Sequence, residues 1–177
     1  MADKSVNEPI LNIPKENYSF IKKFIGCSND EDFITLDTWV DNSQVGEGDL
    51  VLQMDIEGGE YLSLINASDG LLNRFRIIAL EIHWLKYLWD KSCFEMVQSA
   101  LNKILKTHYC VHLHPNNCTS AFTYKDLNIV EVLECTFIRK DRVNNILGYC
   151  TDFPHPLDTD NVVENPTLVL PRNWYGG

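Results

Sequence analysis

The stretch Asp49-Leu-Val-Leu-Gln-Met-Asp-Ile-Glu-Gly-Gly-Glu60 decides the fold class of this chain. A short apolar run rich in Leu and Val leads into an acidic, glycine-containing turn, which predicts a strand ending at Asp55 and a helix over about residues 60–65. A second apolar run, Ile77-Ile-Ala-Leu-Glu-Ile-His83, follows. Both runs are almost continuously hydrophobic rather than alternating, which favours a parallel sheet covered on both faces. We therefore expect an α/β fold.

Elements after these two strands extend the predicted sheet. Ser92-Cys-Phe-Glu95 fits a capping box, so a helix is expected to start near Ser92. The apolar stripe of this helix would consist of Phe94, Val97, Leu101, Ile104 and Leu105. Two more strands are predicted, over residues 109–114 and 130–138.

Composition divides the chain into three predicted parts. Residues 1–32 are polar and interrupted by prolines, and they read as an arm with a short helix over residues 18–25 that ends at Gly26. Residues 33–150 would form the α/β domain, beginning with an extended segment over residues 33–37. Residues 151–177 are rich in proline and would form an irregular tail.

Charge and hydropathy restrict the classes of partner. Asp and Glu number 25 against 15 Lys and Arg, for a net charge of -10, and this acidic balance argues against a nucleic-acid partner. No apolar segment is long enough to cross a bilayer, and the first residues contain no apolar signal core. The six cysteines are dispersed without metal-binding spacing. These features predict a soluble, cytoplasmic protein that binds neither nucleic acid nor membrane.

Polar residues at the predicted strand ends are the candidates for chemistry, because ligands of doubly wound sheets bind beyond the carboxyl ends of the strands. They are Asp55, Glu57, Glu60, Glu81, His83, His114, Asn116 and Asn117. Strand alternation places Glu81 and His83 on one face. His83 is a candidate general base, since an imidazole titrates near neutral pH.

Two alternatives stay open at this stage. In the acidic turn, Gly58 allows close approach of a ligand or of a neighbouring backbone, and the carboxylates could accept hydrogen bonds or bind a cation; Glu57 and Glu60 could instead favour the start of the next helix through its dipole. His112 and His114 share a strand face and could share a metal, or line the core and the strand tip. A third ligand for that pair is not evident, so no metal is assigned.

Four segments in series resemble the FkbM-type methyltransferase family. They are Ile34-Thr-Leu-Asp37-Thr-Trp, Leu52 to Ile65, Phe75-Arg-Ile-Ile-Ala-Leu-Glu-Ile-His83 and His112-Leu-His-Pro-Asn-Asn117. The resemblance implies a Rossmann-like, methyltransferase-type sheet, mostly parallel with one antiparallel strand near the end, that uses S-adenosylmethionine to methylate a hydroxyl of a sugar or small metabolite. The family's Gly-rich cofactor turn has no counterpart before Asp37. The similarity therefore covers the carboxyl-terminal half of such a domain.

The resemblance also implies roles for the strand-end residues. Asp55, Glu81 and His83 would be catalytic, with Asp55 nearest the transferred methyl and Glu81 or His83 as the base. Asp55 and Gly58 would contact the cofactor. Glu57, His114, Asn116 and Asn117 would bind the small-molecule or glycan acceptor.

The missing first strands would leave an open sheet edge for a dimer partner, a second chain or the arm to cover. Two other functions remain as alternatives. One is a non-catalytic binding or assembly module, and the other is a divalent-metal-dependent hydrolase.

Overall fold

The centre of the molecule is a four-stranded sheet of mixed direction. The structure is a computed structural model that describes residues 1–125 and 127–175. The sheet has the order β3-β4-β8-β5. Its strands are β3 (Leu50–Met54), β4 (Phe75–Ile82), β5 (His108–Pro115) and β8 (Leu133–Arg139). β3 and β4 pair in parallel, whereas β8 lies between β4 and β5 and runs antiparallel to both. The predicted α/β class is confirmed, including a reversed strand near the end.

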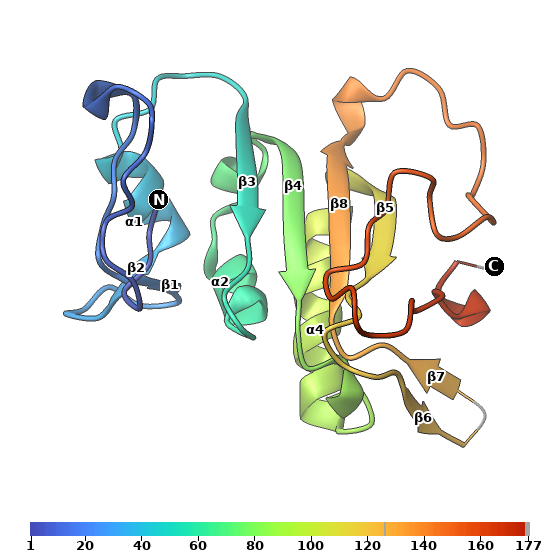
Figure 1. The fold of residues 1–177 in the computed structure, drawn as a ribbon. Coiled ribbons are helices and arrows are strands. Elements are labelled where there is room, and N and C mark those ends of the chain that lie inside the picture. The colour runs from blue at the N-terminus through green and yellow to red at the C-terminus, as the bar shows by residue number, and fades with distance from the viewer. Residues whose placement is uncertain (126, 176–177) are drawn as a thin grey trace.

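Helices and two small sheets surround this centre (Figure 1). The α-helices are α1 (Leu36–Asn42), α2 (Glu60–Asn66), α3 (Asp69–Leu72) and α4 (Lys91–Leu105). The two-stranded sheets are β1 (Phe24–Gly26) with β2 (Phe33–Thr35), and β6 (Phe122–Tyr124) with β7 (Leu127–Ile129). Within the described ranges, no helix is long and apolar enough to cross a bilayer.

The predicted helix over residues 18–25 is wrong. Residues Phe24–Gly26 form β1, which pairs in parallel with β2. An isolated helix of two turns has too few hydrogen bonds to offset its nucleation cost. Pairing instead buries Ile25 and places the rings of Phe24 and Phe33 5.7 Å apart, centroid to centroid. This pairing also crosses the expected boundary at residue 32.

The predicted helix after residue 92 is present as α4, but its start lies earlier. Asp90 is the N-cap residue, and its Oδ1 accepts a hydrogen bond from the Cys93 N–H at 2.9 Å. A carboxylate at this position also interacts favourably with the helix dipole, which explains why Asp90 rather than Ser92 caps the helix. Of the expected stripe, Val97 and Ile104 are buried, whereas Phe94 and Leu105 are exposed.

The two faces of the sheet differ in their cover. One face carries buried apolar side chains, among them Leu52, Ile78, Leu80 and Phe137, and α4 lies behind it in Figure 1 and packs against α2. The opposite face, here called the open face, contains Val51, Gln53, Ile77, Ala79, Glu81, His112, Glu134 and Thr136. Val51 is 66% exposed on it. The expected cover on both faces is therefore wrong at the β3 edge.

The segment after β8 returns across the open face instead of leaving the domain. Its red portion passes in front of β8 and β5 in Figure 1. The Asn117 Nδ2 donates to the carbonyl of Val162 at 2.9 Å, and the Asn165 Nδ2 donates to the carbonyl of Asn117 at 2.8 Å. Leu170 is buried in the core. The tail therefore covers the β5 side of this face and leaves the β3 side exposed.

The Arg139 guanidinium joins three separate segments at the other end of the sheet. It donates to Asp49 Oδ1 and Asp141 Oδ1, both at 2.7 Å, and to the carbonyl of Asn73 at 2.6 Å. The hydrogen bond from Arg139 lowers the pKa of both carboxyl groups below the ordinary value of Asp.

A carboxyl group whose pKa is lower in the folded state stabilises the fold above its unfolded pKa, and this stabilisation is lost as the pH falls through the folded pKa. We expect the free energy of unfolding to fall with acidification below about pH 4. In the Arg139→Gln variant the free energy of unfolding should change less with pH over this range. Urea unfolding between neutral pH and pH 3 measures it, and Arg172→Gln, an equal charge change at an exposed site, should keep the wild-type slope.

Candidate functional site

A pocket on the open face brings the ends of β3 and β4 together. Asp55 directly follows β3, and the parallel register Met54 to Leu80 sets it beside Glu81. Both carboxylates line a pocket of about 220 Å³, together with Gln53, Ala79 and Thr136. The Asp55 side chain is 45% exposed, whereas the Glu81 side chain is mostly covered. The expected meeting of strand-end acids in one crevice is therefore present in the structure.

The backbone conformation of the turn after Asp55 requires a glycine at position 58. Gly58 has φ +100°, and a Cβ atom there would lie 2.3 Å from Cζ2 of Trp84. The Trp84 indole ring therefore occupies the space beside Gly58 in which a ligand was one of the expected neighbours. Glu57, one residue earlier, has φ +55° and an exposed side chain.

The Gly58→Ala substitution is expected to lower the free energy of unfolding by about 2 kcal/mol or more, because a left-handed backbone and an overlap with a ring each cost on the order of 1–3 kcal/mol. Gly48→Ala is the matched control: Gly48 has φ +132°, but nothing lies within 4 Å of its added Cβ. Denaturant titration of both variants separates the two contributions. Equal losses in the two variants would show that Trp84 does not constrain the turn.

Glu60 and His83 form a buried pair under this turn. Glu60, the first residue of α2, is fully buried, and its Oε1 accepts a hydrogen bond from the Ile56 N–H at 2.9 Å. The same oxygen lies 3.1 Å from His83 Nδ1. The Tyr61 hydroxyl donates to the carbonyl of His83 at 2.5 Å. These contacts fix the imidazole ring and orient its other nitrogen outward.

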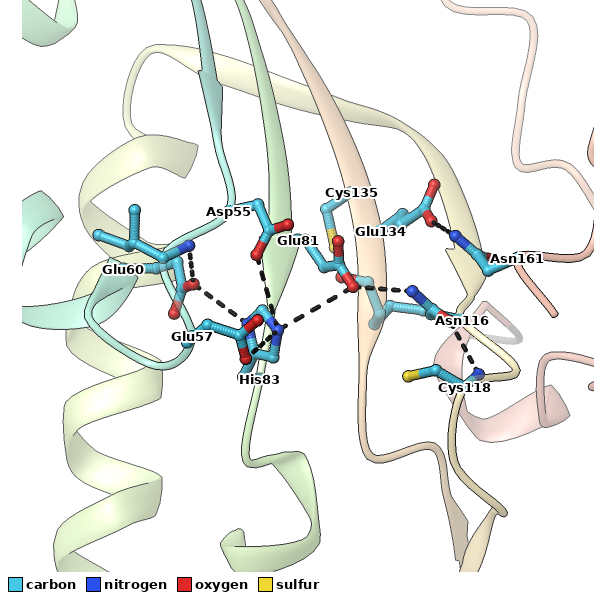
Figure 2. Close-up of polar contacts among 12 residues, drawn as sticks. Asp55, Glu57, Glu60, Glu81, His83, Asn116, Cys118, Glu134, Cys135 and Asn161 are labelled. Carbon is cyan, nitrogen blue, oxygen red and sulfur yellow. Dashed lines mark hydrogen bonds and ion pairs between the residues drawn. The ribbon is translucent and has the colours of Figure 1, made fainter. Parts of the chain in front are cut away.

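His83 Nε2 faces a group of carboxylates. It lies 3.5 Å from Glu57 Oε2, 3.8 Å from Asp55 Oδ1 and 4.0 Å from Glu81 Oε1. In Figure 2 the dashed lines from these three carboxylates meet at Nε2, whereas the line from Glu60 reaches the other ring nitrogen. Such an arrangement can hold a proton or a cation at Nε2, and it can accept a proton from a ligand in the pocket.

Asn116 holds Glu81 from the side of β5. Its Nδ2 donates to Glu81 Oε1 at 2.7 Å, and its Oδ1 accepts from the Cys118 N–H at 2.8 Å. Burial raises the pKa of Glu81, and the charge of Asp55 raises it further, while the hydrogen bond from Asn116 and the charge of His83 lower it. A carboxylate with a raised pKa is a stronger base than an ordinary one.

Two of the expected acceptor-binding residues lie apart from this pocket. The Asn117 amide is buried and holds the tail. His114 is buried near Asp158, 3.4 Å from Nδ1 to Oδ2, and His112 Nε2 lies 2.9 Å from the other oxygen of the same carboxylate. The two imidazoles considered as a metal pair thus share one carboxylate of the tail.

No protein-family model, curated protein or solved structure matches this chain.

Three contacts in and near the site were not predicted from the sequence. They are the Glu60–His83 pair, the Trp84 ring beside Gly58 and Asp158 between His112 and His114. For Glu60 a signal existed, since an acid at a helix start close to an apolar strand lies near the neighbouring strand end. Trp84 and Asp158 gave no such signal.

Proposed function

We propose that this chain is the acceptor-binding part of an S-adenosylmethionine-dependent O-methyltransferase. In this proposal a hydroxyl group of a sugar or small metabolite binds in the pocket between β3, β4 and β8. The observation that carries it is the placement of Asp55 and Glu81, from the ends of two neighbouring parallel strands, in one pocket. Support also comes from β8, because the resemblance to the FkbM-type family implies one antiparallel strand near the end of the sheet.

The pocket residues have separate tasks in this proposal. Methylation of a hydroxyl needs alignment of the oxygen and removal of its proton. Glu81 takes the proton, since its carboxylate lines the pocket and its pKa is raised. Asn116 holds Glu81 in place through the 2.7 Å hydrogen bond. Asp55 accepts a hydrogen bond from a further hydroxyl of the acceptor.

The described residues do not by themselves fit S-adenosylmethionine. Pockets for ligands of that size usually exceed about 300 Å³, and this one measures about 220 Å³. Trp84 rather than open space lies beside Gly58. β3 is a terminal strand of the sheet. We therefore propose that further polypeptide, from a second chain or a second copy, covers the β3 edge and supplies the cofactor site.

The test uses the protein isolated under native conditions with any chain that copurifies. Calorimetry with S-adenosylmethionine should show one site per assembly, and the labelled methyl group should appear on a carbohydrate or polyol acceptor. Asp55→Asn should reduce that transfer. Absence of both cofactor binding and transfer would instead favour a non-catalytic binding or assembly module. Unchanged transfer by Asp55→Asn would contradict the assignment of the site.

The divalent-metal-dependent hydrolase remains the second alternative. It would use the strand-end acids with His112 and His114, and Asp158 lies beside that pair as a third group. Hydrolysis would need a metal ion and an activated water next to the substrate. His112 lines the same pocket as Asp55 and Glu81, but its described ion pair is with Asp158 of the tail, and His114 lies outside the pocket.

A further inference from the structure

The two nitrogens of His83 have different surroundings. Glu60 Oε1 already accepts a hydrogen bond from the Ile56 N–H, so it acts as an acceptor. Nδ1 of His83, which lies beside the same oxygen, must therefore carry a hydrogen and donate it. In a neutral imidazole the other nitrogen, Nε2, then carries the lone pair. The His83 side chain is only 9% exposed, and among the described residues none donates a hydrogen bond to Nε2.

The surroundings of Nε2 consist of acceptors. Carboxylate oxygens of Glu57, Asp55 and Glu81 lie 3.5 to 4.0 Å away. A positive charge between the Nε2 lone pair and these carboxylates would be attracted by all of them. Two species can provide that charge, a proton on Nε2 or a metal cation.

The distances match those between ligands of a metal ion. Nε2 of His83 and one oxygen each of Asp55 and Glu57 all lie within 4.8 Å of one another. Ligand atoms about 2.1 Å from a tetrahedral ion are roughly 3.4 Å apart, close to the 3.5 Å between Nε2 and Glu57 Oε2. The exposed Asp55 and Glu57 side chains can make the remaining adjustment by rotation.

The buried carboxylate behind the ring is the second observation. Histidines that bind metals usually donate their other N–H to a carboxylate or carbonyl, which fixes the tautomer and the direction of the ring. Glu60 has that position, fully buried and 3.1 Å from Nδ1. Figure 2 shows the resulting line from Glu60 through the ring to the group of carboxylates.

We propose that Asp55, Glu57 and His83 bind a divalent transition-metal ion, with Glu60 as the residue that positions His83. One imidazole and two carboxylates suit Mn²⁺ or Zn²⁺ better than Mg²⁺ or Ca²⁺, which prefer oxygen ligands alone. Of the three ligands Asp55 also lines the pocket, so the ion would lie at the edge of the pocket. If the proposed function holds, the ion binds the acceptor hydroxyl there, a role that rests on that function, whereas metal binding itself does not.

Calorimetric titration with Mn²⁺, without any methyl donor, tests the site. Mn²⁺ is the probe because thiolates bind it weakly, so the six cysteines do not compete. Wild-type protein should bind one ion. Glu57→Gln should weaken binding by about tenfold or more; the Glu57 side chain is 86% exposed, so this change leaves the fold intact. Glu47→Gln, the same charge change in a distant exposed loop, should bind as the wild type does.

Two further variants separate ligand from positioning residue. His83→Gln should abolish binding, whereas Glu60→Gln should weaken it by about 10- to 100-fold. His155→Gln, which removes an exposed imidazole outside the site, should have no effect.

Absence of binding up to about 1 mM Mn²⁺, or equal affinities of Glu57→Gln and Glu47→Gln, would overturn the proposal. Either result would leave the methyl-transfer proposal untouched, and failed methyl transfer would leave the metal site untouched.

Discussion

Replacement of Glu81 by glutamine should lower the rate of methyl transfer by about 100-fold or more, because loss of a general base costs on the order of 10²- to 10⁴-fold. Glutamine has the shape of glutamate, and its amide oxygen can still accept the hydrogen bond from Asn116. It cannot take up the proton of the acceptor hydroxyl. The maximal rate should therefore fall, while the KM for the acceptor changes little.

The measurement follows the labelled methyl group in the native assembly. Glu95→Gln is the control, since Glu95 lies on the exposed side of α4, on the opposite side of the sheet from the pocket. Its side chain forms a surface ion pair with Lys91, of the kind that contributes little to stability. Equal rates for the two variants would exclude Glu81 as the base. A raised KM with an unchanged maximal rate would make it a binding residue instead.

Replacement of Ile78 by alanine should lower the free energy of unfolding by about 4 kcal/mol, the usual loss for a large side chain removed from a packed core. Ile78 lies in β4 with no exposed surface, on the helix-covered face of the sheet. Its side chain contacts the core that α2 and α4 complete, so alanine would leave a cavity there.

The neighbouring residue provides the comparison. Ile77 points to the open face, so Ile77→Ala should cost only about 1 kcal/mol, which is the range of strand propensity. Urea unfolding measures both variants under the same conditions. If Ile77→Ala costs as much as Ile78→Ala, another chain covers the open face in solution. In that case the cost of Ile77→Ala should decrease on dilution of the protein.

Several parts of the fold could be predicted because they depend on local sequence. The apolar runs that form β3 and β4 are buried in any compact arrangement, and the stripe with Val97 and Ile104 fixes a helix. Where two signals competed, the prediction failed. Ser92 and Asp90 are both residue types that suit an N-cap position. Asp90 is the N-cap in the structure, because its negative charge interacts favourably with the dipole at the helix start.

Other features depended on contacts between distant segments. The helix expected over residues 18–25 became β1, because β2 offers a pairing partner that only the folded chain provides. The short strands β6 and β7 are exposed except at Ile129, and they have no periodic pattern long enough to indicate them. The cover of the sheet was mispredicted because β3 is nearly continuously apolar yet exposes Val51.

The sequence alone determined that acids and an imidazole follow two neighbouring apolar strands, since strand ends and alternation are local properties. It placed Asp55, Glu81 and His83 near one another for that reason. Only the tertiary structure decided what each side chain contacts: Glu60 binds the inner nitrogen of His83, Trp84 lies against Gly58, and the tail takes Asn117. These contacts join residues 23, 26 and 45 or more positions apart, and such pairings depend on the packing of the whole chain.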